Sequence, residues 1–471
     1  MVDDVWDHLP EGLRQEFLAS RTAADREAFD SHAGPDDSGW EPLRPVILRE
    51  LAYRGLEALS TRVLELTVEA CRRRASTVGE LHRLLRFSNP LRLADPDWPL
   101  AADELTRYAR PDILIEQGRP RFLELNSGTR LGGKNVVPEL AEAYAGLCQD
   151  GGLRPPPSTV DARSAALARS FEAEAGRLGP GRVLVLGYRM IDITGTEVYR
   201  RHDPGDSPII VAVRRAGLEV VRADLDDLRL GSSGQLLAGG APIDVVLIEW
   251  GFGDRIVDDG GLAALRAARH AGTVRLFPCP ESILLSSKVI LAWLHEDCAA
   301  GLLAPADRAL VRTHVPWTAC LGLSQDSGAV ATALEVAAAE RDRLIVKPST
   351  GKSGTGVLFG RQLSHDDWLS AIDSVAAKGP VVLQRRVESG HLAMPFYDRS
   401  RGQQVLAQVP FVLSPFIIDG AAASVAVRHP GPGVASGSVV ISASLGAFAN
   451  TALLTRDAVG SVDPLPQGSV L

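Results

Sequence analysis

The sequence has few of the features that mark secreted, membrane-spanning or nucleic-acid-binding proteins, beginning with cysteine. Its five cysteines, in a chain of 471 residues, are Cys71, Cys148, Cys279, Cys298 and Cys320. They are odd in number and far apart, so they fit neither a disulfide framework nor the close spacing of a zinc site. We expect them to be packing residues.

Long apolar runs and an excess of positive charge are also missing. No stretch approaches the roughly 20 apolar residues of a membrane span, and the first residues, MVDDVWDHLPEGL, are acidic without an apolar run. The formal net charge is −8 and the basic residues are scattered, which argues against nucleic acid or an anionic membrane as a partner. We therefore expect a cytoplasmic protein that binds neither.

Length and composition indicate a large folded chain. A length of 471 residues suggests roughly three domains, and no repeat of solenoid period is present. Residues 41–85 show the apolar spacing of helices. Residues 182–280 alternate apolar strands with helical patterns, which predicts a parallel sheet with covering helices. The proline-rich stretch LRPPPST at 153–159 predicts a linker between these regions.

A glycine-rich segment, RLIVKPSTGKSGTGVLFG at 343–360, contains Gly-Lys-Ser but lacks the Walker phosphate loop. That loop needs a glycine five places before the Gly-Lys pair, and Val346 stands there. The segment instead predicts a strand ending in Lys347 and Pro348, a flexible turn, and a second strand at 357–359. Such a turn allows close backbone approach and offers N–H groups to an anion. It is either a lid over a nucleotide triphosphate or an ordinary hairpin with solvated lysines.

The segment ESILLSSKVILAWLHED, at 281–297, predicts a helix that Ser286 or Ser287 caps and that has one apolar face. Lys288 lies in its first turn, where a positive charge is mildly unfavourable against the helix dipole. An anionic ligand would explain the lysine, and so would simple solvation.

Three oxygen-bearing side chains meet on a predicted hairpin, RPDILIEQGRPRFLELN at 110–126, with its turn at Gly118-Arg119-Pro120. Asp112 lies on the first strand, and Glu124 and Asn126 lie two apart, hence on one face, of the second. Divalent ions such as Mg²⁺ take oxygen ligands and retain substrate phosphates. The pattern predicts a magnesium site, with an exposed polar hairpin face as the alternative.

Together, these segments resemble the ATP-grasp superfamily of ligases. The resemblance rests on Lys288, HVPWT at 314–318, the lysine strand with its glycine-rich turn, VVLQRRVE at 381–388, SVAVRHP at 424–430, and Asp112 with Glu124-x-Asn126. The order differs from the usual one, because E-x-N precedes the lysine strand. Rotating the chain restores it, as in the circularly permuted, glutathionylspermidine synthetase-like branch.

The resemblance implies an α/β (α+β) fold, a circularly permuted ATP-grasp fold with a Rossmann-like pre-ATP-grasp domain and a two-lobed nucleotide grip. Residues 1–150 would hold N-terminal helices and the metal-binding part of the core. Residues 151–285 would form the parallel-sheet domain, and residues 286–471 the lid and nucleotide-binding lobe.

The implied function is an ATP-dependent carboxylate–amine ligase that acts through an acyl phosphate and releases ADP and phosphate. Its cofactors would be ATP and Mg²⁺, and its substrates a small carboxylate and an amine, such as an amino acid or peptide. Both a monomer and a homodimer are compatible with the resemblance. An ATP-grasp phosphotransferase and a catalytically silent nucleotide-binding protein are the alternatives.

The resemblance also assigns roles to individual residues. Lys288 and Lys347 would hold phosphates, and Arg428 would stabilise the transferring phosphoryl group, with a solvent-facing arginine at the sheet edge as the alternative. Independently of the resemblance, His314, His391 and His429 are each either a general base or a structural histidine. The lid residues would be Gly351, Lys352, Ser353, Gly354, Thr355 and Gly356. Gln384, Arg385 and Val387 would border adenine, Glu388 would accept from the ribose, and Ser127, Gly128 and Arg130 would face the substrate.

Overall fold

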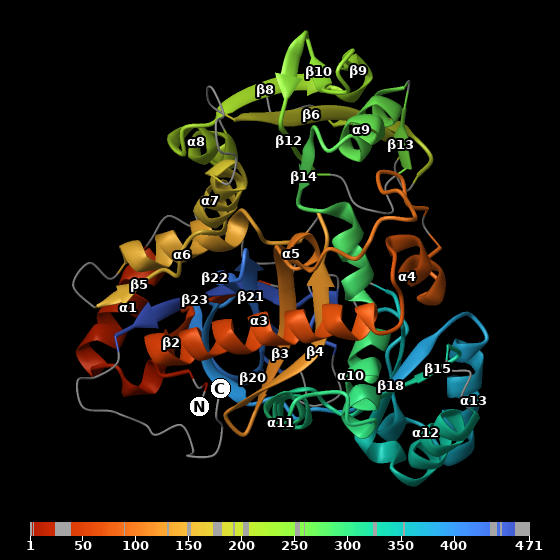
Figure 1. Cartoon of the computed structure of the whole chain (residues 1–471). Coiled ribbons are helices and arrows are strands. Elements are labelled where there is room, and N and C mark those ends of the chain that lie inside the picture. The colour runs from red at the N-terminus through yellow and green to blue at the C-terminus, as the bar shows by residue number, and fades with distance from the viewer. Residues whose placement is uncertain are drawn as a thin grey trace.

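The computed structural model describes a mixed α/β fold over residues 2–456, except residues 3, 24–38, 89, 130, 148–151, 173–180, 192–193, 201–206, 250–254, 259, 324–326, 352–353, 434–439 and 443–444. Several sheets and the helices that pack on them make up the molecule (Figure 1).

The central sheet combines strands from both ends of the chain. Its strand order is β2 (Val46–Arg49), β23 (Phe448–Thr455), β22 (Ala421–His429), β21 (Val412–Ile418), β3 (Tyr108–Glu116) and β4 (Arg119–Ser127), and β5 (Leu153–Arg154) also pairs with β23. The pair β2–β23 is parallel, and the other pairs are antiparallel. Segments nearly 300 residues apart in sequence, β3 and β21, are therefore direct neighbours.

The long helix α3 (Glu50–Arg72) crosses one face of this sheet (Figure 1). Tyr53 is fully buried and donates its hydroxyl hydrogen to the Ala422 carbonyl at 2.6 Å. Apolar residues at helical spacing, including Leu56 and Val63, share that core. The predicted helical spacing over 41–85 is thus right for α3 and for α4 (Val78–Leu84) but wrong for Val46–Arg49, which form β2.

A second antiparallel sheet lies beside the first. Its order is β15 (Thr318–Leu321), β18 (Val381–Arg385), β16 (Leu344–Pro348) and β17 (Leu358–Phe359). Helices α12 (Ser327–Ala339) and α13 (His365–Ala376) pack against it through fully buried Trp368. The predicted strand–turn–strand hairpin of the glycine-rich segment is confirmed, because β17 pairs antiparallel with β16.

Helix α10 (Val289–Ala299) joins this sheet to α3, and α11 (Pro305–His314) follows it. The predicted serine cap is wrong: Lys288 is the N-cap residue, and no side chain caps the helix. Ser286 instead ends a short 3₁₀ helix, Pro280–Ser286, and its hydroxyl accepts from the Ser127 backbone N–H at 2.8 Å. The helix is also buried on more than the one predicted apolar face, because residues 289–294 are all buried.

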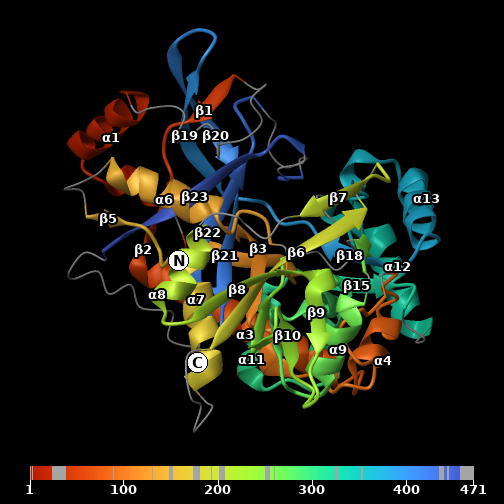
Figure 2. The ribbon, with the colours of Figure 1, turned by 90° about the horizontal axis from the view of Figure 1, so that it is seen from above.

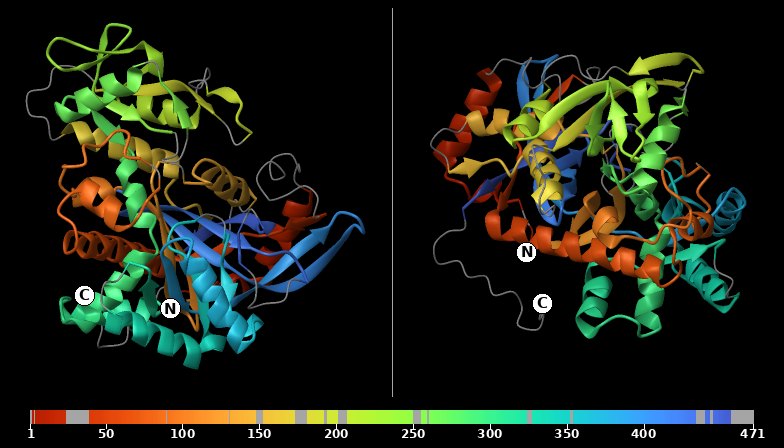
Figure 3. Two further views of the ribbon diagram at one scale, coloured as in Figure 1. Left: turned by 90° about the vertical axis from the view of Figure 1, so that its right-hand side faces the viewer. Right: turned by 45° about the horizontal axis from the view of Figure 1, so that its top comes forward.

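Residues 181–277 form a separate unit at one end of the molecule (Figures 1 and 3). Its sheet has the parallel order β8 (Glu219–Asp224), β6 (Arg182–Ile191), β12 (Val245–Leu247) and β14 (Arg275–Phe277), as the alternating pattern predicted. β7 (Glu197–Arg200) and β13 (Arg255–Val257) pair antiparallel with the second half of β6. The helices are α8 (Pro208–Arg215) and α9 (Gly261–His270), and a small sheet holds β9 (Leu228–Leu230), β10 (Leu236–Ala238) and β11 (Ala241–Ile243).

A further sheet carries a hairpin that projects from the molecule (Figure 2). It consists of β1 (Trp40–Pro42), β19 (His391–Asp398) and β20 (Gln403–Pro410). The remaining helices are α1 (Glu11–Ala23), α5 (Ala102–Leu105), α6 (Val136–Gly146) and α7 (Thr159–Glu172). Residues 155–158 of the predicted linker connect β5 to α7.

Two expectations from composition concern these elements. Cys71, Cys279, Cys298 and Cys320 are buried and free, as expected of packing residues, and Cys148 lies outside the described residues. Within the described part of the chain, none of the helices has the length and apolar character needed to cross a membrane.

Candidate functional site

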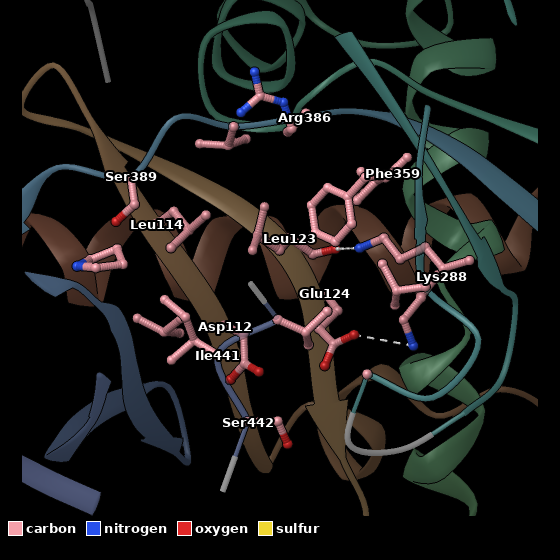
Figure 4. A pocket seen from close by; sticks show the side chains of 18 of the residues that line it. Asp112, Leu114, Leu123, Glu124, Lys288, Phe359, Arg386, Ser389, Ile441 and Ser442 are labelled. Atoms are coloured by element: carbon pink, nitrogen blue, oxygen red, sulfur yellow. Dashed lines mark hydrogen bonds and ion pairs between the residues drawn. The ribbon is translucent and has the colours of Figure 1, made fainter. Parts of the chain in front are cut away.

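A cavity of about 240 Å³ lies between the central sheet and the β15–β18 sheet (Figure 4). One wall comes from the β3–β4 hairpin and β22, and the other from β16, β17 and the end of β18. It gathers residues that are more than 300 positions apart in sequence. The predicted site residues that line it are Asp112, Glu124, Lys288, Lys347, Gly351, Gly354, Thr355, Arg385, Val387, Glu388 and Arg428.

The β3–β4 hairpin places the two carboxylates. Its turn residues are Gln117 and Gly118, with φ angles of 52° and 73°, the left-handed geometry of a two-residue hairpin turn. The predicted turn was therefore placed one residue too late. Across the hairpin Asp112 lies directly opposite Glu124, and both side chains extend into the same space (Figure 4).

A β-bulge next to these carboxylates opens the strand ladder. The pairing passes from Asp112–Glu124 to Ile113–Phe122, so Leu123 has no opposite residue on β3. The Leu123 carbonyl instead accepts hydrogen bonds from Lys347 Nζ and from Gln384 Nε2, both at 3.3 Å. The bulge thus connects the two walls of the cavity.

Asp112 is held between two hydrogen-bond donors. Its Oδ2 atom lies 2.6 Å from Arg428 Nη2, and its Oδ1 atom accepts from the Ser414 hydroxyl at 2.8 Å. Burial alone would raise the pKa of the Asp112 carboxyl, but the positive charges of Arg428 and Arg110 and these hydrogen bonds lower it to about 2. Asp112 is therefore ionised at any physiological pH.

Two buried lysines bring positive charge to the opposite wall. Lys288 pairs with Glu124 at 3.1 Å and is 7% exposed, and Lys347 is 5% exposed. Burial lowers the pKa of Lys347 to about 8, the charge of Glu124 opposes this shift, and the nearby Lys288 adds to it. Besides the Leu123 carbonyl, an anionic ligand in the cavity would stabilise the charged form of Lys347 and raise its pKa again.

The glycine-rich turn closes one side of the cavity. Gly354 and Gly356 have φ angles of 73° and 78°, a backbone conformation that favours glycine. A Cβ on Gly354 would stand 2.2 Å from a methyl group of Val440, so the turn packs against residue 440 through its backbone. Gly356 does not line the cavity, and Lys352 and Ser353 lie outside the described residues.

The far end of the cavity is apolar. Gln384 does not line it; this fully buried side chain also donates to the Thr318 hydroxyl at 3.1 Å. Arg385, Val387 and Glu388 do line it. Sequence reasoning missed the apolar slot, whose residues are Leu114, Leu123, Ile345, Phe359, Val412 and Ile441. Alternation along the strands would have signalled only that these side chains face a core.

One predicted metal ligand, Asn126, and the predicted substrate-facing residues Ser127 and Gly128 do not line the cavity. Asn126 lies opposite Arg110, next to Glu124 on the same face of β4, and its Nδ2 atom is buried without a hydrogen-bond partner. Ser127 binds Ser286, and Gly128, with a φ angle of 114°, packs on Ile283. None of the three lines the cavity. Arg130 is outside the described residues.

The three candidate histidines differ in placement. His391 is exposed and lines the cavity. Nδ1 of His314 is hydrogen-bonded to the Pro120 carbonyl. His429 is fully buried among Phe396 and Phe448, and burial lowers its pKa to about 4. His429 is therefore a neutral core residue.

These oxygen ligands suit a metal ion that is coordinated by the protein and by a substrate together. Asp112 and Glu124 offer two adjacent carboxylates, and Asn126 an amide on the same face. Among the described residues, no group of three or more His, Cys, Asp or Glu side chains could hold a metal. Mg²⁺ typically takes one or two carboxylates together with waters and phosphates, so the set fits that ion.

Comparison with solved structures finds a similar overall fold. No protein-family model and no curated protein match the sequence. The chain is similar to the structure of a glutathione synthetase-like effector from Globodera pallida, with a TM-score of 0.51 and 11% identity over 94% of this chain and 97% of that one. At this identity the likeness concerns the fold alone.

Two other solved structures are more distant. A putative gamma-glutamylcysteine synthetase from Methylobacillus flagellatus has a TM-score of 0.41 and 11% identity, over 84% of this chain and 88% of that one. A D-alanyl-alanine synthetase from Vibrio cholerae has a TM-score of 0.25 and 13% identity, over 50% of this chain and 68% of that one. These two carry no argument about this chain.

Proposed function

We propose that this protein is an ATP-dependent carboxylate–amine ligase with a circularly permuted ATP-grasp fold. The observation that carries the proposal is the cavity in which Lys288, Lys347 and Arg428 converge on the carboxylates of Asp112 and Glu124. Such a site is built for a polyanion bound with a divalent cation. The proposed permutation follows from the rotated order of these segments, and the domain limits of 1–150, 151–285 and 286–471 belong to the same proposal.

The nucleotide would lie along the cavity. Its base fits the apolar end, between Leu114 and Ile345, with Val387 beside it. Glu388 at the cavity rim would accept from the ribose hydroxyls. The phosphates would meet Lys288 and Lys347 and the backbone N–H groups of the glycine-rich turn, 351–356, to which Lys352 and Ser353 belong. An ion pair at 4 Å contributes roughly 4 kcal/mol at an effective dielectric constant of 20.

Asp112, Glu124 and Asn126 would hold Mg²⁺, which, when bound, neutralises charge on the β- and γ-phosphates. In the nucleotide-free protein Arg428 and Lys288 occupy these two carboxylates at 2.6 and 3.1 Å. These cations thus hold the two carboxylates in place. With a metal ion held by Glu124, Lys288 would be available to bind a phosphate oxygen.

The chemistry would proceed in two steps. The carboxylate of one substrate attacks the γ-phosphate of ATP, which gives an acyl phosphate and ADP, and the amine of the other substrate then displaces phosphate to form the amide. Arg428 and Lys347 would stabilise the charge that develops on the transferring group. Ser127, Gly128 and Arg130, in the loop after the metal ligands, would face the reacting carbonyl. The substrates would be amino acids or peptides.

The reaction is tested by its products. With a panel of carboxylates, hydroxylamine in place of the amine should trap the acyl phosphate as a hydroxamate. The protein should release ADP, with ¹⁸O moving from carboxylate to phosphate. Release of AMP, or phosphate without label, would overturn the mechanism. Titration calorimetry with Mg-ATP would identify a protein that binds no nucleotide. Phosphoryl transfer without movement of ¹⁸O from a carboxylate would indicate the phosphotransferase.

A further inference from the structure

Next to the cavity lies a second polar cluster, which the proposed mechanism leaves without a role. It consists of Tyr108 and Arg110 on β3 and Arg163 on α7, with Glu249 after β12. Asn126, opposite Arg110, borders it; its Oδ1 atom belongs to the proposed metal-ligand set, and its Nδ2 atom is open to this cluster. We propose that this arginine cluster binds a carboxylate of the substrate that is not the reacting one. The inference rests on the proposed function and names the substrate class: an amino acid or short peptide with a second, free carboxylate.

The cluster lies in line with the metal-binding carboxylates. Side chains two apart on a strand share a face, so Tyr108, Arg110 and Asp112 form one row along β3. At about 3.4 Å per residue, Arg110 lies roughly 7 Å and Tyr108 roughly 14 Å beyond Asp112. This is about the length of one amino-acid residue or two from the position where the carboxylate would be activated.

Buried hydrogen-bond donors in this cluster lack acceptors. The atoms without a partner are Tyr108 Oη, Arg110 Nε, Asn126 Nδ2, and Nε and Nη1 of Arg163. Tyr108 and Arg163 are each 1% exposed. Buried polar groups are nearly always hydrogen-bonded, so several donors unpaired at one place point to an acceptor that arrives with a ligand. A carboxylate is an acceptor only.

The charges favour an anion at Arg110. Within the described residues the Arg110 guanidinium makes no ion pair, and its one hydrogen bond is from Nη1 to the Gly132 carbonyl. The neighbouring Asp112 is occupied by Arg428. Glu249, the carboxylate nearest to Arg163, is already bound by Arg163 and Lys134. Arg110 therefore has an open position for a charged partner.

The guanidinium groups of the cluster are held by aromatic rings, and Arg110 is its accessible arginine. Arg110 lies over the Phe416 ring at 5.5 Å and Arg163 over the Tyr108 ring at 5.8 Å, contacts that fix the guanidinium planes. Arg110 is partly exposed, and the Glu249 side chain is 34% exposed. A planar guanidinium held in this way binds a carboxylate with two parallel hydrogen bonds.

Binding of simple carboxylates to the full chain tests the assignment. The probes are succinate, L-glutamate and glycine, with glycinamide as the counterpart of glycine that lacks the carboxylate, titrated by calorimetry in the presence of Mg-ADP. We expect at least one acid to bind, its amide not to bind, and Arg110→Met to weaken the acid at least roughly tenfold. Arg110→Lys should recover part of the loss. Arg107→Ala is the matched control, because Arg107 pairs with Asp419 outside the cluster.

The affinity for Mg-ADP distinguishes a failure of this inference from a failure of the proposed function on which it rests. The cluster assignment is overturned if Mg-ADP binds and the acids bind the Arg110→Met variant as tightly as the native chain. It is also overturned if Mg-ADP binds and none of the acids binds the native chain. If the acids bind through Arg110 while Mg-ADP does not bind, the nucleotide function fails and the anion site stands. Hydroxylamine then identifies the bound substrate: a dicarboxylate that yields a hydroxamate is the activated acid, and an amino acid that yields none is the amine.

Discussion

Lys347 carries a desolvation penalty in the cavity. Its pKa is lowered to about 8 from an ordinary value of 10.5, chiefly by burial. Below pH 8 both the folded and the unfolded chain hold the proton, and the folded chain bears the desolvation penalty. Between pH 8 and 10.5 the unfolded chain binds more protons, so this group makes stability rise with pH.

Lys347→Met should therefore stabilise the nucleotide-free protein by roughly 1–3 kcal/mol at pH 7, while weakening Mg-ADP. The stabilisation should fade above pH 10, where the native lysine is neutral. Thermal unfolding at pH 7 and pH 10 with calorimetric Mg-ADP titration measures both effects. A lower melting temperature at pH 7, with Mg-ADP affinity intact, would place Lys347 in a purely structural role.

Glu124 is the residue on which the metal proposal depends. Glu124→Gln keeps the shape and the hairpin register but removes the charge that faces Lys288. Turnover should fall by roughly 100-fold or more, while nucleotide affinity falls only in part, because both lysines remain. The exposed Glu139→Gln is the control. Native turnover in Glu124→Gln at limiting Mg²⁺ would rule out a metal at this position.

At the scale of elements, the β16–β17 hairpin and the β3–β4 hairpin close the site from two sides. Both depend on backbone features: the left-handed glycines of one and the Leu123 bulge of the other. Gly354 combines a positive φ angle with a close approach to Val440. A side chain there would strain the turn and push it from its neighbour.

Gly354→Ala should reduce turnover roughly tenfold or more through impaired closure of the turn, with the fold intact. Gly402→Ala is a matched control. Gly402 also has a positive φ angle, 65°, but lies between β19 and β20, and its nearest neighbour would be 3.7 Å away. Both variants should lose stability through the positive φ angle, and Gly354→Ala should lose more because of the contact with Val440; urea unfolding measures both losses. Equal activity in the two would show that the turn at 354 does not act on the nucleotide.

At the scale of the whole molecule, the central sheet interleaves the two ends of the chain. β2, β3 and β4 come from the first 130 residues, and β21, β22 and β23 from residues 412–455. Neither set has a complete hydrophobic core, since one apolar cluster draws on both. The parallel-sheet unit, by contrast, is contiguous in sequence.

A rearranged chain that begins at residue 181, with the original ends joined by a flexible linker, would keep every strand pair. Because long loops add little to closure entropy, it should fold and bind Mg-ADP within a few-fold of the native chain. Circular dichroism and calorimetry test this. A fragment of residues 181–456 without β2, β3 and β4 is the negative control, and it should not fold. Failure of the rearranged chain alone would show that the native connection between α7 and β6 is required.

Much of the site was predictable because its signals are local. Glycine spacing predicted the β16–β17 hairpin, and period-two spacing placed Glu124 and Asn126 on one face, opposite the strand of Asp112. The parallel sheet followed from alternating patterns in 182–277. Local spacing misled where an element is short, as in Val46–Arg49, whose neighbours on the sheet lie 400 residues away.

The sequence by itself determined which residues carry charge and which turns require glycine, because these depend on side-chain chemistry and backbone sterics within a few residues. Only the tertiary structure decided which of them meet. It turned Gln384 into a buried support, His429 into a core residue and Leu123 into the acceptor that links the two walls. It also brought Arg110 and Arg163 together. Burial, strand register and ion pairing arise from segments hundreds of residues apart, and local patterns hold no information about those distances.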